Sequence, residues 1–328
     1  MADTAITLTC ADYPRLMPLA TGAVRPDGVT LKLLLGESGS WGRRAEMLSR
    51  AVSDPAVQGG EGSMARHLRR IEAGDRSHVA LPAFPLRNLT ARDIYVRRDG
   101  PVRTAEDLAG KRVGSYSWSA SGSIWYRHLL QFLGVDANSF TWFVGNIDDG
   151  QWGVPEAGLP DGVTAIGPHQ ALGPMLEAGE IDALLSPPRP RLFDAAKGPI
   201  VRLLPDFKPV EQDYVRRFGV WPPQHLILLR RDTWLADRSL AVSITEAFKR
   251  SNQVFTSTQR SFPYASPWME QDLDEADALL GPDAHADGLE PNRAAMEIFC
   301  EQAFRAGVTL RRVAVDDYFA EYLESGGA

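Results

Sequence analysis

Arginine and hydroxyl side chains gather in the loops beside the predicted strands of this chain. The arginines are Arg15, Arg87, Arg92 and Arg189, and the hydroxyls are Ser117, Ser119 and Ser121. The three serines stand just before a helical pattern that starts near Ile124. Arginine binds carboxylate or phosphate through paired hydrogen bonds, and a helix N-terminus adds free N–H groups and partial positive charge. These residues predict a site for a small anion, and a carboxylate fits them better than a nucleotide.

The same loops carry further polar and aromatic side chains, and each has a structural alternative to a functional role. The additional residues are Asp12, Tyr13, Glu61, Ser63, Trp118 and His225. Trp118 serves equally as core packing or as a ligand-stacking ring. Arg87 has a structural alternative as the partner of Asp12 or Glu61. Glu61 stands before a predicted helix, where it would satisfy backbone N–H groups, and His225 fits a buried histidine as well as a reactive one. The sequence leaves these alternatives open.

Several well-known site motifs are absent from the sequence. It contains no Gly-x-x-x-x-Gly-Lys-Ser/Thr phosphate loop, no dinucleotide-binding Gly-x-Gly-x-x-Gly and no Gly-x-Ser-x-Gly elbow. The six histidines form no His-x-His or His-x-x-x-His pair. We therefore predict neither a nucleotide site nor a metal site, and we expect no cofactor.

Composition limits the classes of partner and the cellular compartment. The chain has 328 residues, a formal net charge of −7 and no clustered basic face, which argues against a nucleic-acid partner. Two distant cysteines, Cys10 and Cys300, do not make a disulfide framework. The N-terminal residues enter a strand-like alternation at once, without the features of a secretory leader, and no window reaches the ~18–20 apolar residues of a membrane span. If Met1 is the natural start, we expect a cytoplasmic protein with no membrane partner.

Strand and helix patterns alternate along the chain, which predicts an α/β fold. The expected strands are 6–10, 29–35, 78–84, 93–96, 112–114, 140–144, 181–185, 201–204 and 225–229. The expected helices include 41–52, 63–73, 240–256, 270–280 and 292–306. The long connections between strands suit parallel pairing, in which ligands bind beyond the carboxyl ends of the strands.

At this point the loops can be compared as a set with a known family. The chain resembles the 4,5-dihydroxyphthalate decarboxylase family, a branch of the type 2 periplasmic-binding-protein fold. The matching stretches are CADYPR (10–15), EGSM (61–64), FPLR (84–87), DLAGKRVG (107–114), GEIDAL (179–184), RLLPD (202–206), EQDY (211–214) and QH (224–225). The chain departs from the family pattern at residues 90–92 and 222–224, so the acid on which it acts stays open.

The resemblance implies two lobes with a ligand cleft between them. Lobe I would comprise residues 1–92 and 231–328, and lobe II residues 93–230. Within this arrangement His225 or Glu61 would supply a proton and Tyr13 would orient the reacting groups. The substrate-binding residues would be Asp12, Arg15, Ser63, Arg87, Arg92, Ser117, Trp118, Ser119, Ser121 and Arg189.

The resemblance also implies a cofactor-independent carboxy-lyase for an aromatic carboxylic acid, either hydroxylated or heteroaromatic. A non-catalytic binding protein for a small carboxylate, cytoplasmic or exported, is the alternative, because the same fold serves many functions. A biosynthetic lyase acting on a different acid is a third candidate. The sequence is compatible with a homo-oligomer and does not decide the oligomeric state.

Overall fold

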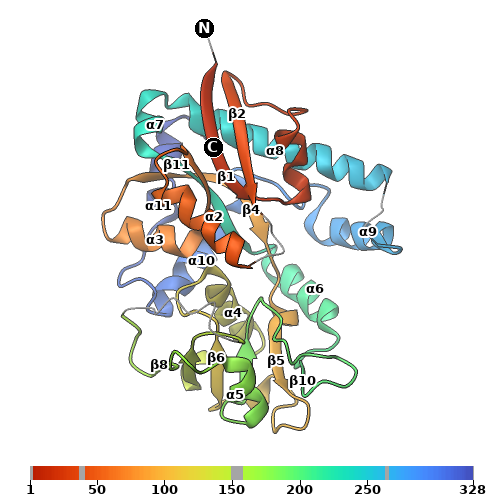
Figure 1. The fold of residues 1–328 in the computed structure, drawn as a ribbon. Helices are drawn as coiled ribbons and strands as arrows, with labels where there is room; N and C mark the ends of the chain where they lie inside the picture. Colours follow the sequence, from red (N-terminus) through yellow and green to blue (C-terminus); the bar gives the residue numbers. More distant parts are fainter. Residues whose placement is uncertain (1–2, 37–40, 149–157, 263–265, 328) are drawn as a thin grey trace. The chain divides into compact units, whose positions relative to one another are not determined.

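The computed structural model describes residues 3–36, 41–148, 158–262 and 266–327 (Figure 1). The chain divides into two units. The first contains residues 1–87, 219–301 and 311–328, and the second contains residues 88–218 and 302–310. Each unit has its own β-sheet, and helices connect most of the strands, so the predicted α/β class is confirmed.

A five-stranded sheet forms the centre of the first unit, in the order β2-β1-β3-β11-β4. The strands are β1 (Thr4–Ala11), β2 (Val29–Gly36), β3 (Gly59–Ser63), β4 (His78–Arg87) and β11 (Pro223–Arg230). β1 pairs in parallel with β2, as expected, and also with β3, which the sequence does not predict as a strand. β11 runs antiparallel to both β3 and β4, so this sheet is mixed rather than wholly parallel.

The position of β11 corrects the domain boundary drawn from the sequence. Residues 223–230 were assigned to lobe II, yet their backbone hydrogen bonds join the sheet of the first unit. The chain changes unit at Arg87/Asn88 and at Phe218/Gly219, and not at residues 92/93 and 230/231. Strand pairing over this separation is a long-range property that the local pattern of the 225–229 segment does not reveal.

β3 has the sequence GGEGS, which lacks the branched and aromatic residues typical of strands. A Cβ atom at Gly59 would lie 2.0 Å from the carbonyl oxygen of Leu228, and one at Gly60 would lie 2.2 Å from that of Thr9. Only glycine permits β1 and β11 to approach this closely on either side of β3. The prediction of a helix beginning at residue 63 is met by α3, for which Ser63 is the N-cap.

β4 is an edge strand, which explains its two prolines, Pro82 and Pro85. Its free edge is covered by a later segment. The backbone N–H of Phe84 donates to Asp287, and the carbonyl of Pro82 accepts from the N–H of Gly288. The 285–288 segment is therefore fixed beside the end of β4.

The first unit also contains helices, the last of which to begin before residue 302 continues into the second unit. They are α1 (Met17–Ala20), α2 (Trp41–Ser53), α3 (Met64–Glu72), α7 (Arg231–Ala236), α8 (Ser239–Ser261), α9 (Met269–Leu280), α10 (Arg293–Arg305), α11 (Val315–Tyr318) and α12 (Ala320–Glu324). α2 packs against β1 and β3, and α8 packs against β4. Short 3₁₀ turns occur at Pro14–Leu16 and Glu290–Asn292. No helix in the described ranges is long and apolar enough to cross a membrane.

The second unit contains a six-stranded sheet in the order β10-β5-β9-β6-β7-β8. The strands are β5 (Ile94–Arg97), β6 (Arg112–Ser115), β7 (Thr141–Val144), β8 (Val163–Ala165), β9 (Ala183–Leu185) and β10 (Ile200–Arg202). The helices are α4 (Ser121–Phe132), α5 (Leu172–Ala178) and α6 (Phe207–Phe218), with 3₁₀ turns at Ala91–Asp93, Glu106–Leu108 and Ala137–Ser139. Its core includes Tyr95, Leu172, Leu176, Ile181, Leu184 and Ile200. Burial of these apolar side chains stabilises the unit.

Candidate active site

A single carboxylate, that of Glu61, lies near the middle of the first sheet. Glu61 follows the two tightly packed glycines of β3, and its side chain is only 1% exposed. Ile227 of β11 stands opposite Glu61 in the sheet register. His225 is two residues along β11 and therefore projects from the same face as Ile227, diagonally across from Glu61. The pairing of β11 with β4 shifts register around His225, an irregularity of the kind that redirects side chains.

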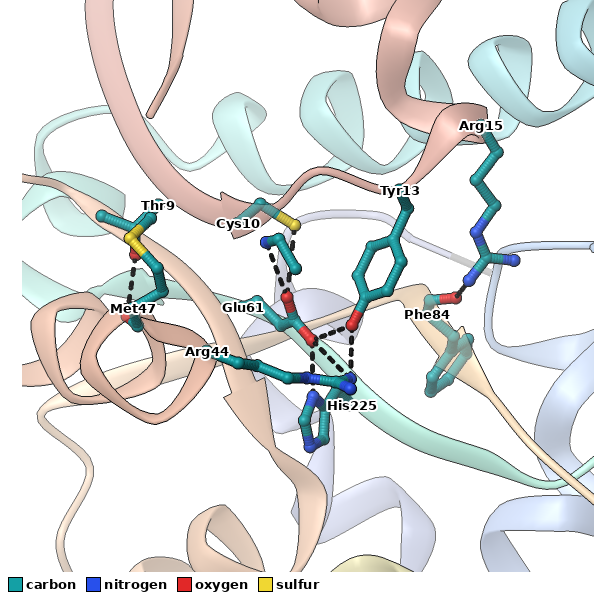
Figure 2. A network of polar contacts seen from close by, with 10 residues as sticks. Thr9, Cys10, Tyr13, Arg15, Arg44, Met47, Glu61, Phe84 and His225 are labelled. Atoms are coloured by element: carbon teal, nitrogen blue, oxygen red, sulfur yellow. Dashed lines mark hydrogen bonds and ion pairs between the residues drawn. The ribbon is translucent and has the colours of Figure 1, made fainter. Parts of the chain in front are cut away.

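Four hydrogen-bond donors surround the Glu61 carboxylate (Figure 2). Oε1 accepts from the Tyr13 hydroxyl at 2.7 Å and from Nδ1 of His225 at 2.5 Å. Oε2 accepts from the backbone N–H of Ala11 at 3.0 Å and from the Cys10 thiol at 3.5 Å. The carboxylate is thus held from both strands that flank β3 and from the loop after β1.

Arg44 on α2 adds positive charge to this cluster. Its Nη2 donates to the Tyr13 hydroxyl at 2.5 Å and lies 3.7 Å from Oε1 of Glu61. The Tyr13 hydroxyl can therefore accept from Arg44 while it donates to Glu61. Arg44 was not among the residues selected from the sequence, because nothing in the pattern of α2 distinguishes it from the neighbouring Arg43.

The electrostatics of the cluster keep Glu61 ionised. Burial by itself raises the pKa of Glu61, but the hydrogen bond and charge of His225, the charge of Arg44 and the N–H of Ala11 outweigh burial, so the pKa lies well below its ordinary value. Burial and the neighbouring Glu61 raise the pKa of Tyr13, which stays protonated. Burial lowers the pKa of His225 despite the opposing effect of Glu61.

The hydrogen bond from His225 to Glu61 fixes the roles of the two ring nitrogens. An ionised carboxylate only accepts hydrogen bonds, so Nδ1 must carry the hydrogen. Nε2 is then the nitrogen that gains or loses a proton. The His225 side chain is 12% exposed, whereas Glu61 is almost fully enclosed. The arrangement resembles other carboxylate–histidine pairs, in which the carboxylate orients the imidazole and stabilises its protonated form.

The structure therefore brings together Tyr13, Glu61 and His225, the three residues for which a catalytic role was predicted. Ser63, at the end of β3, lies opposite His225 in the sheet register and caps α3 by accepting from the N–H of Arg66. Asp12 is exposed. The structural alternative for Glu61 was that it would satisfy backbone N–H groups at the start of a helix. Glu61 does accept from a backbone N–H, but this N–H belongs to Ala11 in β1.

Arg15 and Arg87, predicted to bind substrate, lie at a neighbouring place in the first unit. Arg15 donates to the carbonyl of Phe84 and contacts Nδ1 of His285, both at 2.6 Å. Arg87 donates to the carbonyls of Trp221 and Ala286 and to Oδ1 of Asn292. The structure thus gives Arg87 other partners than Asp12 or Glu61.

The remaining predicted residues belong to the second unit. They are Arg92, Ser117, Trp118, Ser119, Ser121 and Arg189. Trp118 is buried: its Nε1 donates to the carbonyl of Ala306, and the guanidinium of Arg127 lies 3.8 Å from its ring centroid. Ser121 is buried at the start of α4, and Arg189 is exposed with its guanidinium over the ring of Phe193. Arg92 contacts Asn88 and Asp93.

Two serines that flank the predicted serine loop are bonded to its backbone. The Ser115 and Ser123 hydroxyls both donate to the carbonyl of Ser117, at 2.9 and 2.5 Å, and lie 3.2 Å from each other. Within the described residues, no group of three or more His, Cys, Asp or Glu side chains is placed to hold a metal ion.

Comparison with known proteins gives relatives along the whole chain. No family model matches the sequence. A 4,5-dihydroxyphthalate decarboxylase of Comamonas testosteroni is 25% identical over 326 residues, which cover 97% of this chain and 97% of the relative. A 4,5-dihydroxyphthalate decarboxylase of Pseudomonas putida is 28% identical over 215 residues, which cover 64% of this chain and 81% of the relative. The predicted resemblance to this family is confirmed.

Solved structures show the fold. A putative periplasmic sulfonate-binding protein of Methylobacillus flagellatus KT superposes with a TM-score of 0.53 and 11% identity, covering 99% of this chain and 95% of that chain. The periplasmic aliphatic sulphonate binding protein of Escherichia coli gives a TM-score of 0.50 and 15% identity, and the match covers 97% of this chain and 100% of that chain. The predicted periplasmic-binding-protein-like fold is confirmed, and at these identities the likeness concerns the fold alone.

Proposed function

We propose, from the similarity to proteins named 4,5-dihydroxyphthalate decarboxylase, that this chain is a carboxy-lyase for an aromatic carboxylic acid. The observation that carries the proposal is the Glu61–His225 pair, with Nδ1 of the imidazole 2.5 Å from the buried carboxylate. Decarboxylation replaces a carboxylate by a hydrogen, so it requires a positioned proton donor. His225 is the group in this cluster whose remaining nitrogen can serve that purpose.

In the proposed reaction, Nε2–H of protonated His225 gives its proton to the ring carbon that bears the departing carboxylate. The bond between the ring and the carboxylate then breaks, its electron pair returns to the ring, and carbon dioxide leaves. The neutral imidazole regains a proton from solvent. The balance is one aromatic carboxylate and one proton converted to the arene and carbon dioxide, with no change in the oxidation state of the protein.

The other members of the cluster prepare His225 for this step. Glu61 holds the hydrogen on Nδ1 and stabilises the imidazolium form. Tyr13 and Arg44 hold Glu61 ionised and in place. A hydroxyl group on the substrate ring would favour the reaction, because it donates electrons to the ring carbon that is protonated. We therefore expect a hydroxylated aromatic acid as the substrate class.

The test is an assay of carbon dioxide release from 4,5-dihydroxyphthalate and a panel of hydroxybenzoic and heteroaromatic acids, with and without a chelator. His225→Asn retains an N–H that can donate to Glu61 but has no second nitrogen. We expect it to lower kcat by about 10²–10⁴-fold with an unchanged circular dichroism spectrum. His169→Asn, at an exposed histidine of the second unit, is the matched control.

The assay also separates the proposal from its main competitor. The solved structures with the same fold include solute-binding proteins. Thermal stabilisation by several acids, with no release of carbon dioxide from any of them, would favour a non-catalytic binder of small carboxylates. Release that is unaffected by His225→Asn would remove this residue from the mechanism.

A further inference from the structure

A pocket of about 240 Å³ lies beside the Glu61 cluster within the first unit. Its lining includes Tyr13, Arg15, Arg87, Trp221, Phe255 and His285. Tyr13 belongs to both places, because its hydroxyl bonds to Glu61 while the residue also lines the pocket. The volume is below the roughly 300–1,000 Å³ of pockets for drug-sized ligands, which suits a molecule with a single ring.

Within the part of the chain that the structure describes, the two arginines of this pocket have only neutral hydrogen-bond partners. Arg15 is bonded to a backbone carbonyl and to an imidazole nitrogen, and Arg87 to two backbone carbonyls and an asparagine side chain. Nε of Arg87 is buried and has no partner among the described residues. Buried charges are normally paired with an opposite charge. The buried Arg15 and the half-buried Arg87, neither bonded to a carboxylate, therefore leave an excess of positive charge at the pocket.

The nearest buried acid does not remove this excess through direct contact. Asp287 uses its two carboxylate oxygens to accept from the N–H of Phe84 at 2.8 Å and from Asn252 at 2.7 Å. Burial raises the pKa of Asp287 to about 6, although Arg87 and Arg15 oppose the rise. The acid is thus held by neutral donors, and neither arginine forms a hydrogen bond with it.

His285 presents a donor rather than an acceptor. Arginine can only donate hydrogen bonds, so the contact between Arg15 Nη1 and His285 Nδ1 requires that Nδ1 accept. Burial and the charges of Arg15 and Arg87 lower the pKa of His285 to about 3, so the ring is neutral near pH 7. Its single hydrogen is therefore on Nε2, which forms no hydrogen bond with the described residues. This N–H matches a carboxylate or phenolate oxygen.

Aromatic rings form a further part of the wall. The centroid of Trp221 lies 4.6 Å from that of His285, and the centroid of Phe255 lies 6.2 Å from it. A planar ring can stack or meet edge-to-face against such a wall. The pocket thus combines positive charge, a fixed donor and aromatic surface in a small volume.

We propose that this pocket binds the ring and one acidic oxygen of a single-ring aromatic acid, with His285 as a specificity-determining residue. The inference rests on the proposed function, since it assigns the substrate subsite of that reaction. The acid group meets Arg15 and Nε2–H of His285, and the ring packs against Trp221 and Phe255. Tyr13 then connects the bound ring with the Glu61–His225 pair.

The test measures binding by isothermal titration calorimetry, independently of turnover. The probe is 3,4-dihydroxybenzoate, with benzyl alcohol as an uncharged ring and cyclohexanecarboxylate as a charged molecule without an aromatic ring. His285→Asn keeps an acceptor for Arg15 but loses the ring and its N–H. We expect it to raise Kd about tenfold or more, and Trp221→Leu to raise it about fivefold. Both control molecules should bind at least tenfold more weakly than the probe.

The control variants are His169→Asn and Trp268→Leu, both at exposed positions, which should leave Kd unchanged. Thermal unfolding of every variant identifies any loss of folding. If the probe does not bind the unmodified protein, or binds the His285 and Trp221 variants equally well, the pocket assignment is wrong, whatever the turnover. If the probe binds as expected but no acid releases carbon dioxide, the subsite stands and the proposed decarboxylase fails.

Discussion

His225 and Glu61 are 164 positions apart in the chain, yet Nδ1 of the imidazole lies 2.5 Å from the carboxylate. The contact depends on β11 lying next to β3, so the backbone ladder of the sheet fixes both residues. Because His225 and the carboxylate that orients it stand on adjacent strands, the imidazole has little freedom to change its orientation. Such rigidity is what positioned acid–base catalysis requires.

The pH dependence of the reaction should respond in opposite directions to two neighbours of His225. If the imidazolium is the donor, kcat/KM falls as pH rises through the pKa of His225, which burial holds below its ordinary value of about 6.5. Arg44 lowers this pKa and Glu61 raises it. Arg44→Gln should therefore move the fall in kcat/KM to higher pH, and Glu61→Gln should move it to lower pH, each by about one unit. Profiles measured from pH 4 to 8 that shift in the same direction would contradict this role.

Glu61 should make the protein more sensitive to acid. Its pKa is lower in the folded protein than the value of about 4.3 for an unfolded glutamate. The resulting stabilisation is complete above about pH 4.3, and it is lost as pH falls toward the folded pKa. Glu61→Gln should lower the free energy of unfolding by about 3 kcal/mol at pH 7 and weaken its pH dependence below about pH 4. Thermal unfolding across pH checks this, with Glu177→Gln on an exposed face of α5 as the control.

Gly60→Ala should strongly destabilise the first unit. Gly60 has a φ of +153°, and an added Cβ would lie 2.2 Å from the Thr9 carbonyl and 2.4 Å from its hydroxyl. We expect a loss above about 3 kcal/mol in chemical denaturation, because backbone must move to relieve the overlap. Gly110→Ala is the matched control, since its φ is +70° but no atom lies within 4 Å of the added Cβ. Conformational strain alone should cost it about 1–2 kcal/mol. Equal losses in the two variants would show that close packing at β3 is unimportant.

Two substitutions near the serine loop distinguish a structural role of this loop from a role in substrate binding. Ser123 is buried and bonded to the Ser117 carbonyl, so Ser123→Ala should lower stability by about 1 kcal/mol. Ser119, in the same loop, is half-buried. If Ser119 binds the substrate, as the sequence predicts, Ser119→Ala will raise KM with little change in kcat. An unchanged KM would mean that the loop is only a structural connection.

Much of the fold could be predicted from the sequence, because its strands carry a local apolar signal. The predicted ranges of β1 and β2, 6–10 and 29–35, agree with the observed bounds to within two residues. β3 was missed because GGEGS has no strand propensity. The need for glycine in β3 becomes apparent only when the backbones of the two neighbouring strands are in place beside it.

The candidate site shows the same limit. Tyr13, Glu61 and His225 were selected because they stand next to strands or turns, and the structure places them in contact. Arg44 and His285 could not be selected, since one lies within a helix and the other in a polar loop. Their proximity to the site depends on how α2 packs on the sheet and on how residues 285–288 cover the edge of β4. Both are tertiary contacts with no local pattern.

The place of β11 in the first sheet also determines when the site can form during synthesis. The ribosome makes β1 through β4 first, then the main part of the second unit, and only afterwards residues 223–230. Until β11 emerges, β3 and β4 lack the strand that joins them, and Glu61 lacks its histidine. Residues 88–218 of the second unit are continuous in the chain and are made while the first sheet still lacks β11. A ribosome stalled before residue 223 therefore carries an open first sheet in which Glu61 has Tyr13 and Arg44 beside it but not yet its histidine.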